Sequence, residues 1–430
     1  LTAGSIAGVI VSGGATKFDN DVYVSDGTNF FVSLGAGFTA LGSNTASSSI
    51  VNFTQFDDLI IAVGDAHTPK KQTLNSASNF STLASSGTAP AASVVGVLNR
   101  FVVVGNLGTA GSTATSFPNA IQWSGIDNPT SWPTPNSSTA IAQQSGYQEF
   151  DSRWGQITGI HGGDQHGVVF QTNAVTRVTY VGPPVVFQFD LISNDFGSLY
   201  RRCSIQAGPW YYFISKAGFC RTDGVNVERI GAGKVDRFFF DAFTGAEAQI
   251  MAGYDPVNKL VCWAYPTSAG SASTCNRMIS FNTDTSSWTY QDVNLESLVT
   301  PGGGTGSFAQ KLMAFGPGSI NTLGFFQGTA GSAVFETSDT EINPGGRAYV
   351  DGFAPHVESS ATAPAMTMRL GYRDDLGTAP TYTSATSANS ATGFANFRVD
   401  ARYHRAELTI TGNFDRITGA VVSGKPSGLR

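Results

Sequence analysis

The chain has 430 residues and a formal net charge of −6, and 13% of its residues are charged, about half the ~25% of an average soluble domain. A protein that grips nucleic acid needs clustered Lys and Arg, so this composition argues against one. The low fraction of charged residues indicates either a surface partly covered by partners or a surface kept soluble by Ser and Thr. Both interpretations stay open.

Short apolar segments bounded by Gly, Asn, Asp and Ser recur along the chain, while helical periodicity is nearly absent. This pattern predicts an all-β fold. In chain order the segments are Val22–Leu34 and those beginning at Leu59, Phe101, Gly167, Trp210, Leu260 and Leu312. From Leu59 onwards they are separated by 42, 66, 43, 50 and 52 residues. One propeller blade uses roughly 40–50 residues, so the sequence predicts a β-propeller of four-stranded antiparallel blades.

Several loops between these segments are candidates for docking. The interval of 66 residues contains the Pro-rich segment Asn128–Gln144, and Pro limits the entropy lost on binding. The Ser/Thr-rich segments Gly108–Phe117 and Ser384–Gly393 are the other expected docking loops. The Asp26–Gly27 and Asp223–Gly224 pairs predict tight hairpin turns in which Gly has a positive φ.

The best-formed predicted blade lies between Tyr254 and Tyr290. YDPVNKLVCWAY predicts a turn at residues 255–258 followed by a buried strand. In the following hairpin, we expect Asp284 to close the turn through backbone hydrogen bonds. Trp288 should then pack between neighbouring blades.

The pattern of apolar residues changes at about residue 343. From there, segments such as RAELTIT alternate apolar and polar residues, which predicts strands with one solvent-facing side. The sequence therefore predicts a propeller over 1–342 and an accessory β-sandwich-like domain over 343–430, with a closing blade as the alternative for the second part. We interpret the arginines of this region as members of intrachain ion pairs, with pairing between subunits as the alternative; they are Arg369, Arg373, Arg398, Arg402, Arg405 and Arg416.

Signatures of catalysis or cofactor binding are weak. The chain has no HExxH, no Walker A loop and no G-x-S-x-G, and Gly302–Ser307 is interpreted as a flexible loop. HGGDQH brings His161, Asp164 and His166 within six residues, which permits a metal site, although a turn bonded to its own backbone explains the same residues. Asp19–Asp21 lacks the ligand series of a calcium loop. We therefore predict no catalytic, cofactor-binding or metal residues and no enzyme activity.

The four cysteines have neither zinc-site spacing nor the density of a disulfide scaffold. We expect them to be reduced and structural, with Cys262 in the core and a Cys203–Cys220 pair across a hairpin as the alternative. No apolar run reaches 18 residues, and the N-terminal stretch lacks a basic region. We expect a soluble chain without a visible export signal and without membrane contact.

Two phrases, WSGIDNPTSW (Trp123–Trp132) and YFISKAGFCRTDGVNVERIG (Tyr212–Gly231), resemble the β-propeller proteins of short-tailed podoviruses. That family includes tail hub, packaged-DNA stabilisation and tail nozzle proteins. The resemblance extends to RVDARYHRAELTITGNF (Arg398–Phe414) and the terminal SGLR (Ser427–Arg430). Relatives carry a longer N-terminal section, whereas this sequence opens at Leu1, so the resemblance implies that the N-terminus was trimmed, disordered or processed.

The resemblance implies a structural virion protein of a phage tail, assembled in the host cytoplasm. Such a protein forms a homo-oligomeric ring, a hexamer in the family, below the adaptor that joins the portal. It retains packaged DNA and forms part of the ejection conduit, and its further partners are a tail needle, spike or fibre. DNA would pass through the lumen without specific binding. The alternative function is a carbohydrate-binding or sialidase-like propeller, which would need convergent carboxylates or a Tyr with an Arg cluster.

Overall fold

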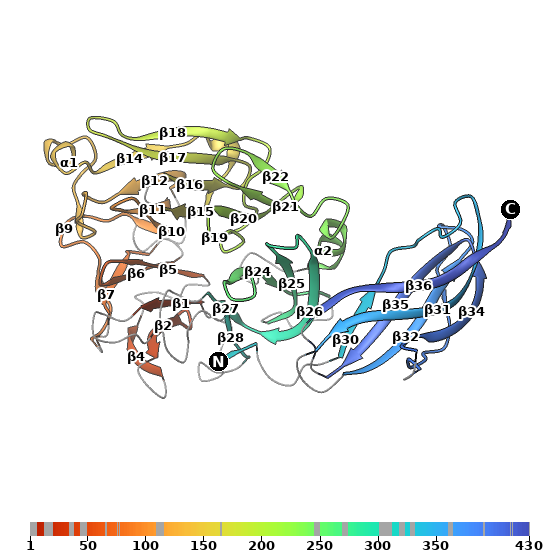
Figure 1. Ribbon diagram of the computed structural model, residues 1–430. Helices are drawn as coiled ribbons and strands as arrows, with labels where there is room; N and C mark the ends of the chain where they lie inside the picture. The colour runs from red at the N-terminus through yellow and green to blue at the C-terminus, as the bar shows by residue number, and fades with distance from the viewer. Residues whose placement is uncertain are drawn as a thin grey trace. The chain divides into compact units, whose positions relative to one another are not determined.

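The computed structural model describes residues 7–12, 20–33, 38–43, 50–64, 67–74, 76, 78–108, 116–163, 166–244, 250–268, 274–300, 312–317, 323–326, 332–359, 364–389, 392–412, 414 and 416–429. The chain forms two compact units, Leu1–Phe326 and Gln327–Arg430. In both, most of the regular structure is antiparallel β-sheet (Figure 1). The prediction of an all-β chain with four-stranded antiparallel sheets is confirmed.

The first unit contains, in its described part, seven antiparallel sheets that follow one another along the chain. The first three are β1–β4 (Ala7–Ser12, Asn20–Ser25, Asn29–Ser33, Phe38–Ser43), β5–β8 (Val51–Phe56, Leu59–Gly64, Lys70–Thr73, Ser81–Thr82), and β10, β11, β12 and β14 (Ala91–Leu98, Phe101–Gly108, Phe117–Trp123, Gly146–Glu149).

Three further sheets have four strands and the last has three. They are β15–β18 (Ile157–Gly162, His166–Gln171, Val175–Gly182, Val186–Ser193), β19–β22 (Ile205–Ala207, Trp210–Ser215, Gly218–Thr222, Val227–Arg229), β23–β26 (Met251–Asp255, Leu260–Tyr265, Cys275–Asn282, Trp288–Leu295) and β27–β29 (Ser297–Val299, Met313–Phe315, Leu323–Phe325). A 3-10 turn covers Ser152–Trp154, and a short helix, α2, covers Asp236–Ala242.

Each apolar segment found in the sequence contains the second strand of one sheet. The segments beginning at Leu59, Phe101, Trp210 and Leu260 are β6, β11, β20 and β24, and Val22–Leu34 spans β2 and β3. These strands are buried on both faces, because a neighbouring sheet packs on each side, so they are continuously apolar. The spacing of the segments therefore measures the length of one sheet with its turns.

Successive sheets of the first unit pack against each other through buried apolar residues. Seven clusters of buried apolar residues lie in the first unit, and each joins a sheet to the next. One cluster joins the last sheet to the first through Val22, Val24, Val299, Met313 and Phe315. The first strands β1, β5 and β10 contact in sequence, and β27 contacts β1. Figure 1 shows the first strands of the sheets innermost.

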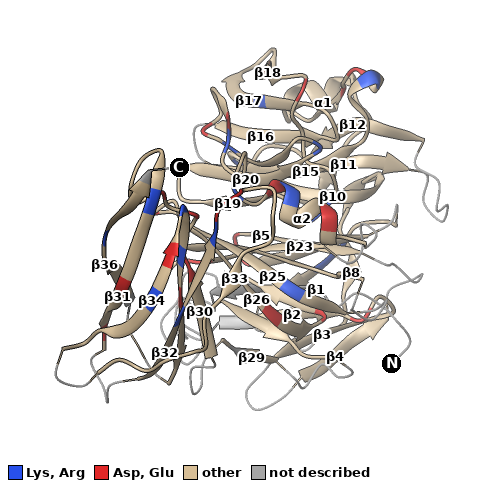
Figure 2. Cartoon of the chain, turned by 90° about the vertical axis from the view of Figure 1, so that its right-hand side faces the viewer, with Lys and Arg blue, Asp and Glu red and all other residues tan. Residues whose placement is uncertain are grey.

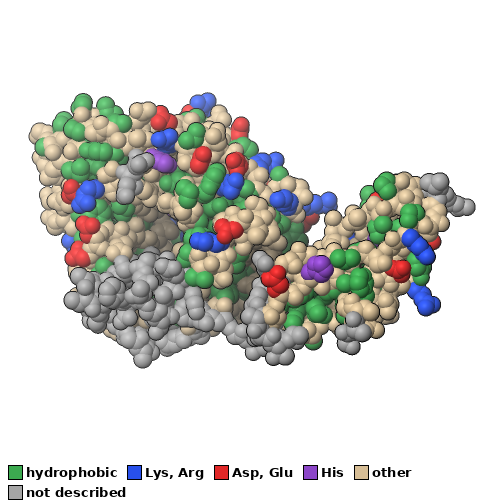
Figure 3. All heavy atoms as spheres, in the orientation of Figure 1, with side chains coloured by type: hydrophobic (Ala, Val, Ile, Leu, Met, Phe, Trp, Pro, Cys, Tyr) green, Lys and Arg blue, Asp and Glu red, His purple; other side chains and the backbone are tan. Residues whose placement is uncertain are grey.

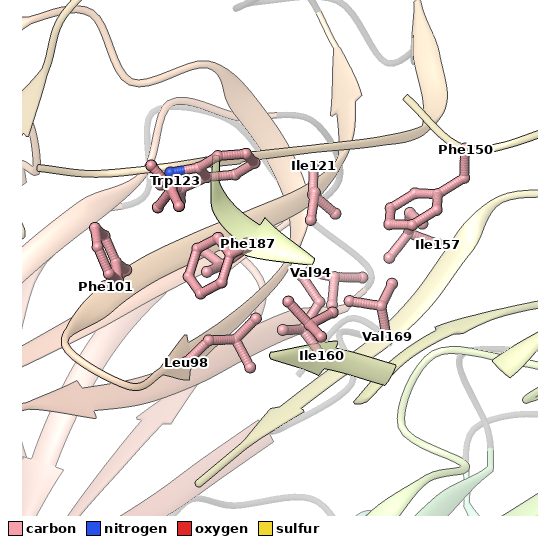
Figure 4. Packing of buried hydrophobic residues seen from close by; sticks show 13 residues of the cluster. Val94, Leu98, Phe101, Ile121, Trp123, Phe150, Ile157, Ile160, Val169 and Phe187 are labelled. Carbon is pink, nitrogen blue, oxygen red and sulfur yellow. The ribbon is translucent and has the colours of Figure 1, made fainter. Parts of the chain in front are cut away.

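The interface between the third and fourth sheets illustrates this packing (Figure 4). The ring of Phe187 on β18 meets Phe101 and Trp123 of the third sheet, with centroids 5.1 and 5.2 Å apart. Ile157 and Ile160 of β15 close the same cluster from the fourth sheet. Edge-to-face ring pairs of this kind add stability beyond their buried area, which favours a rigid interface.

The Pro-rich segment Asn128–Gln144 is more ordered than the predicted docking loop. Its β13 (Ser131–Trp132) pairs in parallel with β9 (Ser86–Gly87), and Trp132 is fully buried with its Nε1 donating to Pro129 O at 2.9 Å. The short helix α1 (Ser138–Ala142) follows, capped by the Ser137 side chain. The buried indole of Trp132 therefore anchors this segment. The sequence analysis, which treated the segment as a loop, did not predict that burial. The other two expected docking loops lie partly outside the described residues.

The hairpin predictions are confirmed in one respect and wrong in another. Gly27 and Gly224 have φ of 89° and 86°, as their turns require. In the hairpin between β25 and β26, however, Asn282 and not Asp284 closes the turn, because Asn282 Oδ1 accepts from the backbone N of Asp284 and of Thr285 at 2.9 and 3.0 Å. The side chain at the first turn position reaches the two amides that follow it, and one of these amides belongs to Asp284 itself.

Trp288 does pack between sheets, as predicted. Its ring lies 4.9 Å from Phe219 of the preceding sheet and 6.1 Å from Trp263 of its own sheet. Its Nε1 donates to the carbonyl of Ile230 at 3.2 Å. The predicted turn at 255–258 is also present, with Asp255 Oδ1 accepting from the backbone N of Val257 and Asn258 at 3.0 Å.

The second unit has two sheets around its own apolar cluster. One contains β30, β35, β32 and β33 (Ser332–Glu336, Tyr403–Thr411, Ala365–Arg373, Thr381–Tyr382), and the other contains β34, β31 and β36 (Ala395–Ala401, Gly346–Glu358, Arg416–Leu429). The cluster draws from both sheets, as in a sandwich. The alternative of a closing blade is therefore not what these residues form.

The predicted domain boundary is too late. The compact units divide after Phe326, whereas the sequence suggested a boundary after Ile342. The reason is β30, which pairs with β35 from Ser332↔Thr411 to Glu336↔Glu407 and so belongs to the second unit. The partner of β30 lies more than 70 residues further along the chain, so no local pattern in the sequence shows the pairing.

Four of the six arginines singled out in the sequence, Arg369, Arg373, Arg402 and Arg405, form intrachain ion pairs. Arg405 Nη2 lies 2.5 Å from Asp339 Oδ2, and Arg373 pairs with the same carboxylate. Arg369 makes two hydrogen bonds to Glu407, of 2.6 and 2.7 Å. Figure 2 shows Lys and Arg interspersed with Asp and Glu along these strands.

Candidate functional site

Four neighbouring sheets of the first unit line a cavity of about 320 Å³ at their innermost strands. Its described lining comes from β5, β10, β15, β19 and the segment before β19. The lining residues are Asn52, Phe53, Thr54, Val94, Val95, Gly96, Val97, Thr158, Gly159, Ile160, His161, Gly162, Arg202, Ser204 and Gln206. We call this the central cavity. Its size lies at the lower end of the range for small-molecule sites.

Glycines allow the inner strands to approach each other at the central cavity. A Cβ on Gly162 would lie 1.9 Å from the carbonyl oxygen of Val97, and one on Gly96 would lie 2.5 Å from that of Ile160. Both distances are far below van der Waals contact, so a side chain at either position would force β10 and β15 apart. These two glycines therefore set the width of the cavity between β10 and β15.

His161 lies on β15 and faces the segment that enters β19. Its Nε2 is 2.8 Å from Ser204 Oγ, and its ring contacts Phe170 and Tyr211. Burial lowers the pKa of His161 to about 4. The imidazole is therefore neutral at pH 7, and it acts as a hydrogen-bonding group rather than as a cation.

Arg202 is the cationic residue of the described lining. Its Nη2 donates to Ser297 Oγ of β27 at 3.2 Å and contacts Met251 Sδ of β23 at 3.4 Å. One side chain thus connects the fifth, sixth and seventh sheets. Burial lowers the pKa of Arg202 to about 10, which leaves the guanidinium charged at neutral pH. The described lining contains no Asp or Glu to neutralise it.

The residues considered for a metal site do not come together among the described positions. His161 faces Ser204, whereas His166 lies beside the turn at Gly224. Asp164, Asp19 and the Gly302–Ser307 loop lie outside the described residues. Within the part of the chain that the structure describes, no group of three or more His, Cys, Asp or Glu is placed to hold a metal ion.

The cysteines are free and buried, as expected. Cys203 and Cys220, the alternative pair, belong to different apolar clusters, and Cys262 lies in the core between the last two sheets. Burial raises the pKa of Cys262 and of Cys275 to about 12. All four thiols therefore serve as small core residues.

The second unit has a cavity of about 300 Å³ between its own two sheets. Its described lining is mainly apolar and includes Phe335 on β30 and Val422 on β36, both partly exposed, together with the buried His404. The cavity opens where the edge strands β30 and β36 leave the sandwich uncovered. Nothing in the described lining points to a particular ligand.

An exposed apolar patch lies on the first unit around α1 and the β17–β18 hairpin. Ile141, Val181 and Val185 expose 65, 49 and 63% of their surface. Tyr180 of β17 donates to the side chain of Gln144, just after α1, at 2.7 Å, which holds the two elements together. Figure 3 shows hydrophobic side chains gathered over this corner. We call Ile141, Val181 and Val185 the α1 patch.

The sequence analysis considered His161 for a metal site and did not single out Arg202. The signal for Arg202 was slight, a pair of arginines just before the apolar strand WYYFIS, with nothing to show which strands would face it. The sialidase-like alternative needs carboxylates or Tyr at the centre, and the described lining of the central cavity has none of these. That alternative gains no support from the described residues.

Among the described residues, none of the helices is long and apolar enough to cross a lipid bilayer. No family model matches the chain, and no curated protein matches its sequence. A solved structure with a similar arrangement is that of the computationally designed Ika8 protein, which is 10% identical, with 76% of this chain and 98% of that chain covered and a TM-score of 0.41. The resemblance to podovirus tail proteins therefore stays a prediction from the sequence.

Proposed function

We propose that the first unit is a seven-bladed β-propeller. Seven successive antiparallel sheets, an apolar cluster between each pair of neighbours, and contact between β27 and β1 support this arrangement. Each blade has two apolar faces and is stable only when neighbours cover both. Ring closure covers the outer faces of the first and last sheets, which an open array would leave exposed.

The function that this geometry supports best is that of a structural virion protein of a phage tail, a subunit of a hub or nozzle ring below the portal and adaptor. The observation that carries this proposal is the position of the two segments that resemble podovirus tail proteins, Trp123–Trp132 and Tyr212–Gly231, in the packed core of the first unit. Trp123 and Trp132 bound the first phrase and are both buried. Phe219, in the second, packs against Trp263 and Trp288 between two sheets. These residues of the two segments thus stabilise a rigid body.

In this function the partners are further copies of the chain in a hexameric ring, the portal–adaptor complex, and a needle, spike or fibre. The chain retains packaged DNA and forms part of the ejection conduit, with DNA passing through the lumen of the ring. A net charge of −6 suits a wall along which DNA slides without specific binding. The protein is not an enzyme, is assembled in the host cytoplasm, and resides in the virion tail.

The α1 patch is the surface that we assign to a neighbouring subunit. Large apolar side chains grouped on one exposed surface are typical of interaction sites. Ile141 belongs to the segment that the sequence marked for docking, and the hairpin that carries Val181 and Val185 is rigidified by two consecutive prolines, Pro183 and Pro184. A preorganised surface loses little entropy when a partner binds.

Mass photometry of the purified full chain, alone and mixed with the portal–adaptor complex, tests this function. We expect a closed ring, formed alone or on the complex. Val185→Asp should prevent it, because a carboxylate would be buried in the interface. Val257→Asp, at an exposed turn on another sheet, is the matched control and should assemble as the parent does. A wild-type chain that stays monomeric and does not bind the complex would contradict the proposal.

A further inference from the structure

Two aromatic side chains lie together on the surface of the first unit. Phe238 of α2 and Tyr290 of β26, the edge strand of the sixth sheet, have ring centroids 4.9 Å apart. They expose 37 and 55% of their surface. Single exposed apolar residues are normal, whereas two exposed rings in contact form a patch that needs an explanation. We call Phe238 and Tyr290 the aromatic platform.

A guanidinium and a carboxylate lie beside the aromatic platform. The guanidinium carbon of Arg277 on β25 is 5.3 Å from the ring centroid of Phe238 and 5.4 Å from that of Tyr290. Arg277 Nε donates to Asp292 Oδ1 at 3.4 Å, and the Asp292 side chain remains 77% exposed. A guanidinium can only donate hydrogen bonds and a carboxylate can only accept them. The platform therefore has both kinds of group within reach of one ligand.

The charges around the aromatic platform are balanced. Arg277 pairs with Asp292, and Arg237 and Asp241, on either side of Phe238 along α2, pair with each other at 3.2 Å. Each of these cations already has its own carboxylate. A nucleic acid needs Lys and Arg that are free to neutralise phosphates, and a cationic ligand needs free carboxylates. The balance of charge favours a neutral ligand.

The apolar surface of the platform is small. The exposed neighbours of Tyr290 on β26 are Thr289, Gln291 and Asp292, which are all polar. Phe240 is also exposed, but it lies two positions from Phe238 on α2, and residues two apart on a helix do not face each other. A stable protein interface buries about 800 Å² on each partner, far more than two partly exposed rings supply. The size of the platform favours a small ligand unit.

We propose that the aromatic platform binds a neutral glycan, with one sugar ring stacked on the aromatic rings and its hydroxyl groups bonded to Asp292 and Arg277. One face of a glucose or galactose ring consists of C–H groups, which pack against the electron-rich face of an aromatic ring. Sugar hydroxyls both donate and accept, so they suit a carboxylate and a guanidinium placed side by side. The site is separate from the central cavity, involves no hydrolysis, and is independent of the tail function.

A glycan array probed with the labelled full chain tests the proposal. We expect the chain to bind neutral glycans, and Tyr290→Ala should abolish this signal because it removes the more exposed ring. Phe240→Ala is the matched control, since Phe240 has the same exposed fraction as Phe238 on the same helix, and it should keep the signal. Binding to acidic glycans only, binding to none, or equal signals from Tyr290→Ala and the wild-type chain would overturn the proposal.

Titration calorimetry with the strongest neutral glycan then measures the contribution of the ring. Tyr290→Ala should weaken the affinity about tenfold, whereas Tyr290→Phe retains the stacking surface and should bind within about twofold of the wild-type chain. A loss in Tyr290→Phe as large as that in Tyr290→Ala would contradict stacking on the ring.

A further measurement uses the wild-type chain, so it does not depend on whether a variant folds. In saturation-transfer NMR, the C–H protons on one face of a single sugar unit should receive the strongest transfer from the aromatic protons of the protein. Transfer spread evenly over the glycan would contradict a stacked sugar. A short oligothymidylate that binds through Tyr290, when neutral glycans do not, would assign the platform to nucleic-acid bases and overturn the proposal.

Discussion

His161 Nε2 and Ser204 Oγ lie 2.8 Å apart, and this hydrogen bond joins β15 of the fourth sheet to the segment that enters the fifth. It lies at the centre of the first unit, where the inner strands converge on the central cavity. The neutral imidazole required by its buried position makes the junction sensitive to acid.

The first prediction concerns pH. Burial lowers the pKa of His161 to about 4 from an ordinary value of 6.5. Between these values the unfolded chain binds a proton that the folded chain does not, so this stability is complete above pH 6.5 and is lost as the pH falls toward 4. The shift corresponds to about 3 kcal/mol. In urea unfolding at pH 7 and pH 4.5, His161→Gln should lose less stability on acidification than the parent.

The matched control is His356→Gln, because His356 lies exposed on β31 of the second unit. This variant should keep the acid sensitivity of the parent chain. Equal acid sensitivity in His161→Gln and the parent would contradict the assignment of the effect to His161.

The second prediction distinguishes two residues of one hairpin. Asn282→Ala removes the acceptor for two backbone N–H groups and should reduce the free energy of unfolding by about 1 kcal/mol. Asp284→Ala should change it by less than about 0.5 kcal/mol, as is usual for surface positions. Chemical denaturation of both variants measures the difference, and a larger loss for Asp284→Ala would show that the turn is closed differently.

The third prediction tests whether the seven sheets of the first unit close into a propeller, with the last sheet packed on the first. Phe38 of β4 and Phe315 of β28 belong to the first and last sheets, and their ring centroids lie 5.7 Å apart. A double-mutant cycle with Phe38→Ala and Phe315→Ala should give a coupling energy of about 0.5–1.5 kcal/mol. Phe38 and Phe281, which belong to sheets that are not neighbours, should be additive. If the losses of unfolding free energy caused by Phe38→Ala and Phe315→Ala were additive, the first and last sheets would not be packed together and the propeller would be open.

The fourth prediction concerns the second unit. Asp339 accepts from two guanidiniums, of Arg373 and Arg405, and its side chain is 11% exposed. Asn at this position would leave both cations without their shared anion, so Asp339→Asn should cost about 2–4 kcal/mol in denaturant unfolding. Asp241→Asn breaks an exposed pair with Arg237 and should cost less than about 0.5 kcal/mol. If Asp339→Asn and Asp241→Asn lost similar amounts of unfolding free energy, the shared ion pair at Asp339 would contribute no more than an exposed pair.

The same carboxylate predicts how the second unit responds to acid. The hydrogen bond from Arg405 lowers the pKa of Asp339 below its ordinary value, and Arg373 adds to the effect. Its contribution to stability is therefore present above about pH 4 and is lost as the pH falls through the lower pKa of the folded chain. The Asp339→Asn variant should lack this part of the acid dependence.

The sequence predicts the sheets well because the information is local. A strand buried on both faces must be apolar along its length, so β6, β11, β20 and β24 could be located and the length of a sheet measured from their spacing. Turns in which Asp precedes Gly were equally visible, since Gly27 and Gly224 need a positive φ. These features depend on residues a few positions apart.

The sequence says less where residues distant along the chain meet. Arg202 and Ser297 are 95 positions apart, and no local pattern shows that their sheets share a centre. The pairing of β30 with β35, which sets the boundary between the two units, is equally remote. Trp132 looked like part of a loop, because the two-residue strand that it forms pairs with another two-residue strand, β9.

Immunogold electron microscopy of intact virions from the genome that encodes this chain tests the central claim most directly. Antibodies against the second unit should place gold at the tail vertex, where a ring below the portal and adaptor would lie. Virions that lack the protein, when infected-cell lysates contain it, would contradict a structural role in the tail.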